Sequence, residues 1–186
     1  MRHSLALAMT LAAGLAGASY ARAAEITLSV VGTNDLHGRL FTGDAGRGGL
    51  DVLGGYLYNL REARAADGGA VLLFDAGDTF QGGIESNLSE GLMVVDAYNA
   101  LGYTALAVGN HDFDYGPVDP RGPATRWLAA GPPNQDALDP RGALKAAAAR
   151  ARFPFLAANI LDGATREPVR WPNVSPAALV SAAGIR

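Results

Sequence analysis

Short apolar runs alternate with segments of helical spacing along most of this chain, and this alternation constrains the fold more than any other feature. Four runs rich in β-branched and apolar residues predict strands: 26–32, 70–74, 104–108 and 155–158. Three segments with apolar residues at helical spacing lie between them: 50–66, 91–101 and 143–152. Strands that alternate with helices predict an α/β layered domain whose sheet is mainly parallel. Ligands of such sheets bind beyond the carboxyl ends of the strands.

The remaining segments are typical of loops and short pieces of strand. Residues 43–49 form a glycine-rich loop, and the Pro-, Gly- and Asp-rich residues 117–140 predict a long surface loop with one helical turn around Trp127. Residues 169–171 and 178–182 are expected to be shorter antiparallel pieces. Three polar residues after the second strand are assigned to a loop: Thr79, Gln81 and Asn87.

The N-terminus is typical of an export signal. A basic start at residues 2–3, an apolar run over 5–18 and a small-x-small pattern at 21–23 predict a signal peptide over 1–23. An uncleaved anchor is the alternative, but the apolar run is shorter than the roughly 20 residues that a membrane span needs. We therefore expect residues 24–186 to be exported, to the periplasm or out of the cell, without a stable membrane span.

Length and composition exclude several classes of protein. A chain of 186 residues that is 49% hydrophobic is long enough for one domain with a core. A net charge of −3 provides no basic surface for a nucleic-acid polymer. The absence of cysteine excludes disulfides, thiolate zinc sites, iron–sulfur clusters and cysteine nucleophiles.

Polar residues follow the first two predicted strands directly. Asp35 and His37 lie two apart, so in an extended segment their side chains point the same way and can converge on one cation. After the second strand, Gly77 allows a tight turn, and Asp78 then projects over the edge of the sheet. Taken singly, each of these features is also typical of residues that cap turns and helices.

A third polar motif follows the third predicted strand. Asn110 offers an amide oxygen, His111 can donate a proton, and Asp112 and Asp114 are near enough to orient that histidine. After the predicted signal peptide the chain has only two histidines, and each stands beside a carboxylate at a strand end. Oxygen and imidazole ligands without thiolate suit zinc, manganese, cobalt or iron. The layout therefore predicts a metal site.

These three motifs resemble the first three signatures of the calcineurin-like metallophosphoesterases. The matching segments are Asn34-Asp-Leu-His-Gly38, Phe74-Asp-Ala-Gly-Asp-Thr-Phe-Gln-Gly82 and Gly109-Asn-His-Asp-Phe-Asp114. More narrowly they resemble the exported 5′-nucleotidases, a branch that includes UDP-sugar hydrolases and 2′,3′-cyclic-nucleotide phosphodiesterases. The resemblance extends over about residues 26–161 and implies a metallophosphoesterase-type layered sheet with flanking helices.

The resemblance also implies a role for each residue of the motifs. It implies two divalent metal ions with four ligands in this chain: Asp35 and His37 on the first metal, Asp78 bridging both, and Asn110 on the second. His111 would stabilise the phosphoryl transition state and assist the leaving group, with Asp114 as its partner, whereas Asp112 receives no catalytic role. Two cations suit hydrolysis of a phosphate ester of a nucleotide by metal-activated water, because they neutralise the charge of the ester. Proton transfer without metal supplies only about 10²–10⁴-fold.

The match ends before the family's later signatures. The family completes its site with a lone histidine and a Gly-His-x-His or Gly-His-x-Gln segment, yet no histidine follows His111. We therefore interpret the chain as an N-terminal fragment whose sheet is incomplete at the C-terminal end. We expect it to bind metal weakly and to turn over nucleotides poorly or not at all. Two alternatives stay open: a thiohydrolase or cyclic-nucleotide phosphodiesterase of the same superfamily, and an inactive metal-binding remnant.

Overall fold

The structure is a computed structural model that describes residues 25–43, 46, 48–118 and 139–186. The predicted signal peptide and the predicted helical turn around Trp127 lie outside the described residues, so both stay predictions.

Five parallel strands form a single sheet in the order β1-β2-β3-β4-β5, so neighbours along the chain are also neighbours in the sheet. The strands are β1 (Leu28–Thr33), β2 (Ala70–Asp75), β3 (Ala105–Ala107), β4 (Phe155–Leu156) and β5 (Val174–Ser175). Because all strands run the same way, their carboxyl ends share one edge of the sheet. This confirms the α/β class predicted from the alternation of strands and helices.

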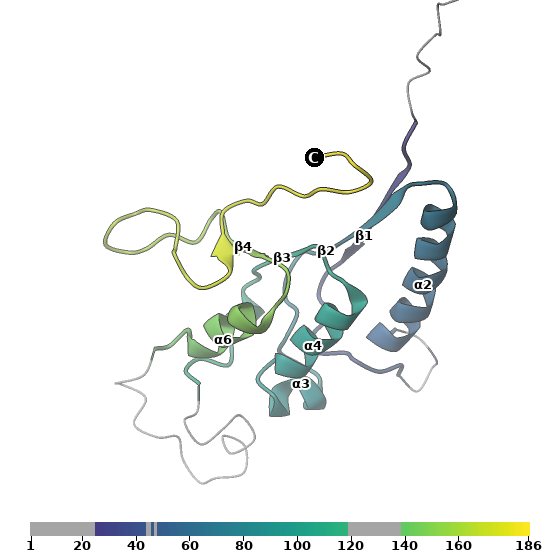
Figure 1. The fold of residues 1–186 in the computed structure, drawn as a ribbon. Helices are drawn as coiled ribbons and strands as arrows, with labels where there is room; N and C mark the ends of the chain where they lie inside the picture. Colours follow the sequence, from purple (N-terminus) through teal and green to yellow (C-terminus); the bar gives the residue numbers. More distant parts are fainter. Residues whose placement is uncertain (1–24, 44–45, 47, 119–138) are drawn as a thin grey trace, which may run out of the picture.

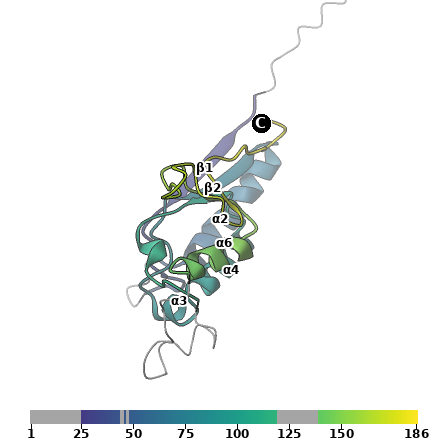
Figure 2. The same ribbon diagram turned by 90° about the vertical axis from the view of Figure 1, so that its left-hand side faces the viewer.

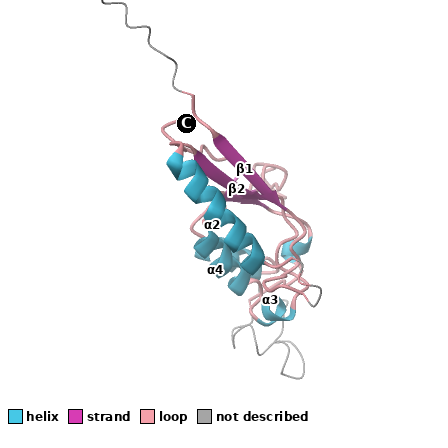
Figure 3. Cartoon of the chain, turned by 90° about the vertical axis from the view of Figure 1, so that its right-hand side faces the viewer, coloured by secondary structure: helices cyan, strands magenta, loops and turns pink. Residues whose placement is uncertain are grey.

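Three helices cover one face of this sheet (Figures 1 and 2). They are α2 (Leu50–Ala66), α4 (Leu92–Leu101) and α6 (Gly142–Arg150). Figure 3 shows α2 and α4 on the same side of β1 and β2. Beyond β5, the last part of the chain runs on the side of the sheet away from the helices (Figure 1). In the described part of the chain, no helix combines the length and apolarity needed to cross a membrane.

The core lies between the sheet and the helices. Leu57 of α2, Leu73 of β2 and Tyr98 of α4 are all completely buried. On the opposite face of β1, Val30 is 68% exposed. The apolar contacts that hold the fold together are therefore made on the helix side of the sheet.

The predicted helices agree closely with the observed ones. The first, predicted over 50–66, has those bounds, and α4 ends at Gly102 in the left-handed conformation (φ 68°) that favours glycine at this position. In the described residues, the sequence pattern misses two short helices: α3 (Ile84–Leu88), within the segment that holds Asn87, and the 3-10 helix η1 (His111–Phe113). A helix of five residues is too short to show helical spacing of its apolar residues.

The predicted antiparallel pieces near the C-terminus need correction. Within the described residues 139–186, no strand forms over 169–171, and an isolated antiparallel bridge joins Leu161 to Pro168 instead. The fifth strand is β5, parallel to β4. The Asn173 side chain explains its position, because its Nδ2 donates to the carbonyls of Ala148, Ala151 and Phe153 and so fixes the chain beside β4. The piece predicted over 178–182 is reduced to one isolated bridge, between Ala182 and Ile185.

Candidate metal centre

The loops that follow β1 and β2 lie side by side and exchange backbone hydrogen bonds. The amides of Asp35, His37 and Gly38 donate to the carbonyls of Gly77, Asp78 and Thr79, at 3.0, 3.1 and 2.9 Å. These bonds continue the pairing of β1 with β2 beyond the end of the sheet. The first two polar motifs are therefore held in register by the backbone itself.

Two glycines allow the loop after β3 to approach the same place. Gly77 has a φ of 102°, and a Cβ there would lie 2.7 Å from the backbone nitrogen of Gly109. A Cβ on Gly109 would in turn overlap the backbone nitrogen and Oδ1 of Asp78. Because only hydrogen fits at both positions, the loops that carry Asp78 and His111 can pack directly against each other.

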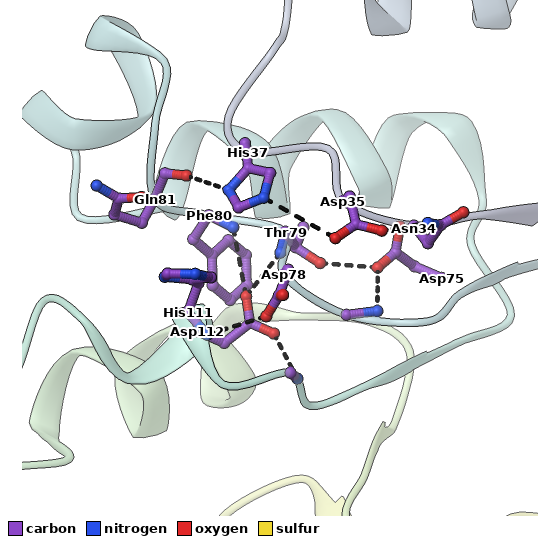
Figure 4. Close-up of polar contacts among 12 residues, drawn as sticks. Asn34, Asp35, His37, Asp75, Asp78, Thr79, Phe80, Gln81, His111 and Asp112 are labelled. Carbon is purple, nitrogen blue, oxygen red and sulfur yellow. Dashed lines mark hydrogen bonds and ion pairs between the residues drawn. The ribbon is translucent and has the colours of Figure 1, made fainter.

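Asp35, His37 and Asp78 form a group that could hold a metal ion. Each offers one ligand atom, and these atoms lie within 4.8 Å of one another. Within the group, His37 Nε2 and Asp35 Oδ1 are 3.9 Å apart. Figure 4 shows the three side chains converging from two neighbouring loops. The structure thus brings together three of the four predicted ligands.

A backbone carbonyl orients the imidazole of His37. The ring Nδ1 lies 2.9 Å from the carbonyl oxygen of Gln81, so Nδ1 carries the hydrogen and donates it (Figure 4). In the neutral ring the lone pair is then on the other nitrogen, Nε2, which faces Asp35; this is the tautomer that a metal ligand requires. The sequence pattern assigns Gln81 only to a loop. The sequence could not predict this contact, because any residue at position 81 would offer the same main-chain carbonyl.

All three members of this group have left-handed backbone conformations. The φ angles are 51° for Asp35, 48° for His37 and 55° for Asp78. Such conformations are uncommon outside glycine and cost on the order of 1–3 kcal/mol each, although Asp and His tolerate them better than most residues. The surrounding structure therefore holds these three residues in place at some cost to stability.

The third motif adds His111 to the group. Its backbone amide donates to Asp78 Oδ1 at 2.9 Å, and its ring lies edge-on to that of His37, with centroids 5.3 Å apart. His111 Nδ1 lies 2.7 Å from Asp114 Oδ2. This hydrogen bond is the main reason that the pKa of His111 is raised, with smaller contributions from the charges of Asp114 and Asp78. Asn110, the fourth predicted ligand, is exposed one residue before His111.

Two buried carboxylates, those of Asp112 and Asp75, bind the backbone of the loops that carry the candidate metal ligands. Asp112 is 1% exposed and accepts hydrogen bonds from the amides of Thr79, Phe80 and Gly109. Burial raises the pKa of Asp112, and the three amide bonds oppose that shift. The carboxylate therefore ties the loop after β3 to the loop after β2, which is consistent with the absence of a predicted catalytic role.

The second buried carboxylate is Asp75 at the end of β2, which the motif analysis does not single out. It is 3% exposed and accepts from Gly77 and Thr79, among others. Thr79, assigned above to a loop, is completely buried. A signal for Asp75 does exist, because a carboxylate that continues an apolar strand must find partners once it is buried.

Comparison with known proteins places this geometry in a family. The family model described as calcineurin-like phosphoesterase matches residues 28–163, more than half of the chain. The 5′-nucleotidase of Vibrio parahaemolyticus is 31% identical over 173 residues, which are 90% of this chain and 27% of that protein. Protein UshA of Salmonella pullorum is 29% identical over 92% of this chain and 28% of its own length. The chain thus spans about a quarter of the length of these relatives.

A solved structure shows the same fold. The 5′-nucleotidase precursor of Thermus thermophilus superposes with a TM-score of 0.57 and is 29% identical. The match covers 84% of this chain and 26% of that one. The parallel sheet, the three polar loops at its carboxyl edge and the matched family model lead to one conclusion: this chain belongs to the calcineurin-like phosphoesterase family.

Proposed function

We propose that this chain carries the N-terminal part of a dimetal phosphohydrolase of the 5′-nucleotidase type. The observation that carries the proposal is the convergence of Asp35, His37 and Asp78 at the carboxyl edge of the sheet, with ligand atoms within 4.8 Å. The relatives support the substrate class, because two of the proteins described above are named 5′-nucleotidases. Family membership supports a hydrolase.

The donors present fit two divalent cations. Asp35 and His37 would hold the first, Asp78 would bridge both, and Asn110 would hold the second. The orientation of His37 supports this assignment, since the bond to Gln81 leaves Nε2 available. When bound, two such cations neutralise the charge of a phosphate ester and activate water for its hydrolysis.

His111 would act on the phosphoryl group. Its bond to Asp114 favours the protonated imidazole, because a carboxylate within hydrogen-bonding distance stabilises the positive charge. With Nδ1 turned to Asp114, Nε2 is the nitrogen that can donate to a phosphoryl oxygen or to the leaving group. The distance of 5.3 Å between the rings of His37 and His111 supports a shared site.

The same proposal includes export. The basic and apolar N-terminal segment predicts a cleaved signal peptide over 1–23, with the periplasm or the cell exterior as the destination. N-terminal sequencing of the secreted product tests this: Ala24 is the expected first residue, and a product that retains Met1 contradicts it.

The test of the metal and substrate assignment uses the full chain with Mn²⁺ and three substrates. We expect Mn²⁺ binding that depends on Asp35, His37 and Asp78. We also expect slow hydrolysis of AMP to adenosine and phosphate, rather than opening of 2′,3′-cyclic AMP to a 2′- or 3′-monophosphate or cleavage of UDP-glucose to UMP and glucose 1-phosphate. Chromatography of the products distinguishes the three reactions. Asp96→Asn is the matched control, because it removes the same charge from an exposed ion pair with Arg150. Mn²⁺ affinity that is equally weakened in Asp96→Asn and Asp35→Asn, or absent in the unsubstituted chain, would overturn the proposal.

A further inference from the structure

The Asp75 carboxylate is densely hydrogen-bonded and lies beside the metal centre. It stands at the end of β2, is 3% exposed, and accepts four hydrogen bonds. Its partners are the Gly77 amide (2.8 Å), the Thr79 hydroxyl (2.8 Å), the Thr33 hydroxyl (2.6 Å) and the Tyr98 hydroxyl (2.7 Å). None of these four donors is among the proposed metal ligands, but two of them, Gly77 and Thr79, flank the proposed ligand Asp78 in the chain.

The two oxygens of Asp75 serve different parts of the molecule. Oδ1 accepts from Gly77 and Thr79, the residues immediately before and after Asp78 (Figure 4). Oδ2 accepts from Thr33 and Tyr98. One oxygen therefore holds the turn that presents Asp78, and the other anchors that turn to the core.

The anchor in the core is a buried aromatic pair. Tyr98 is completely buried and stacks on Tyr103 with ring centroids 3.6 Å apart and planes 7° from parallel. Burial raises the pKa of Tyr98, so its hydroxyl stays protonated and donates to Asp75. The Thr33 hydroxyl donates its one hydrogen to Asp75. In the 2.9 Å contact between Thr33 and Tyr103, the Tyr103 hydroxyl is therefore the donor.

The same carboxylate also reaches the loop after β1. Thr33 is the last residue of β1 and stands two residues before Asp35. The strand ends that lead to Asp35 and Asp78 thus meet on one buried carboxylate. Asp78 keeps a left-handed φ of 55°, and conformations of this kind persist only where the surroundings over-determine them.

We propose that Asp75 is a positioning residue for Asp78: it holds both neighbours of that ligand and so sets the direction of its carboxylate. This inference rests on the proposed function, since it assumes that Asp78 binds metal. A purely structural Asp75 would stabilise the fold and leave the metal affinity of the folded protein unchanged. Outer hydrogen-bond partners of metal sites typically contribute about 10–100-fold in affinity, which is large enough to separate the two roles.

The experiment measures the Mn²⁺ affinity of the full chain by electron paramagnetic resonance of the free ion, below the melting temperature of every variant. Thr79→Val removes the hydroxyl bond to Asp75 Oδ1 and should weaken Mn²⁺ binding by about tenfold, whereas Thr79→Ser keeps the hydroxyl and should restore the affinity. Asp75→Asn should also weaken binding, because the amide nitrogen that replaces one carboxylate oxygen cannot accept the two hydrogen bonds made to that oxygen. Ala147→Gly, in the buried face of α6, is the control that lowers stability elsewhere.

The outcomes separate the two claims. Loss of affinity in Thr79→Val and Asp75→Asn, with recovery in Thr79→Ser and no change in Ala147→Gly, supports the positioning role. Lower melting temperatures with unchanged affinity in Thr79→Val and Asp75→Asn overturn it and leave the proposed function standing. If the unsubstituted chain binds no Mn²⁺, both the proposed function and the positioning role fall. If Asp75→Asn does not fold, the pair of Thr79 variants decides.

Discussion

The candidate metal centre has an outer rim (Asp35, His37, Asp78, His111 and Asp114) and a buried base (Asp75 and Asp112). Both parts contain aspartates, but the aspartates have different roles in each. At the rim, Asp35 has a side chain that is 58% exposed and carries one short polar contact to Asn34 and a longer one to His37. At the base, Asp75 and Asp112 are nearly inaccessible and accept four and three hydrogen bonds. A buried carboxylate that already accepts three or four hydrogen bonds has little capacity left for a cation, whereas an exposed one has oxygens from which a cation can displace water. Burial therefore separates the proposed ligands from the acidic residues that support them.

The largest effect should come from Asp78, which belongs to the rim but is held by the base. Asp78→Ala should abolish Mn²⁺ binding at both positions and, with it, metal-dependent phosphate release, because the residue is the proposed bridge. His37→Ala should weaken one metal only, because Asp78 and Asn110 remain for the other. Equilibrium dialysis against Mn²⁺ gives the stoichiometry of each variant. Two metals retained in Asp78→Ala would place the bridge elsewhere.

His111 should separate turnover from metal binding. His111→Ala should lower phosphate release from AMP by about 10²–10⁴-fold, or to the background of the assay, since it removes a proton donor. Metal should remain, because His111 contacts Asp78 through its backbone amide, which alanine preserves. Parallel measurement of bound Mn²⁺ and phosphate release checks this. Equal metal loss in His37→Ala and His111→Ala would remove the distinction between the two histidines.

Asp112 should affect folding far more than an exposed carboxylate does. Asp112→Ala leaves three amides without their acceptor, those of Thr79 and Phe80 buried and that of Gly109 partly buried, so we expect a loss of about 2–4 kcal/mol in the free energy of unfolding. Asp114→Asn, at a side chain that is 39% exposed, should change it by less than about 0.5 kcal/mol. Urea unfolding of the metal-free chain measures both. Comparable losses would mean that burial does not distinguish base from rim.

The smallest effect concerns the pH dependence of the rim. The pKa of His111 is raised by its bond to Asp114, so in the metal-free chain the protonated form is favoured by folding. The resulting stabilisation is fully present below the unfolded-state pKa of about 6.5 and is lost as the pH rises through the higher folded-state value. Asp114→Asn should shift the NMR titration of His111 to lower pH. A titration that does not move would show that the contact with Asp114 is not maintained in solution.

Much of the fold and part of the site follow from local sequence patterns. The apolar runs and helical spacing predict α2 and the parallel strands β1 to β4, because burial and hydrogen bonding within each element depend on residues close together in the chain. The place of the proposed metal ligands follows as well. Parallel strands bring their carboxyl ends to one edge, so polar residues placed directly after them must meet.

The tertiary structure decided what depends on contacts between distant residues. The prediction of an antiparallel strand over 169–171 was wrong, because no strand forms there and the fifth strand is β5, parallel to β4. Its position depends on Asn173, whose side chain bonds to the carbonyl of Phe153, 20 residues earlier in the chain. The tautomer of His37 depends on a main-chain carbonyl 44 residues along the chain, that of Gln81. The same holds for Asp75 and Asp112, whose residue type is shared with the proposed ligands Asp35 and Asp78. Only the packing of α4 and the three loops around them made them supports, because solvent exposure is a property of the folded chain and not of the residue.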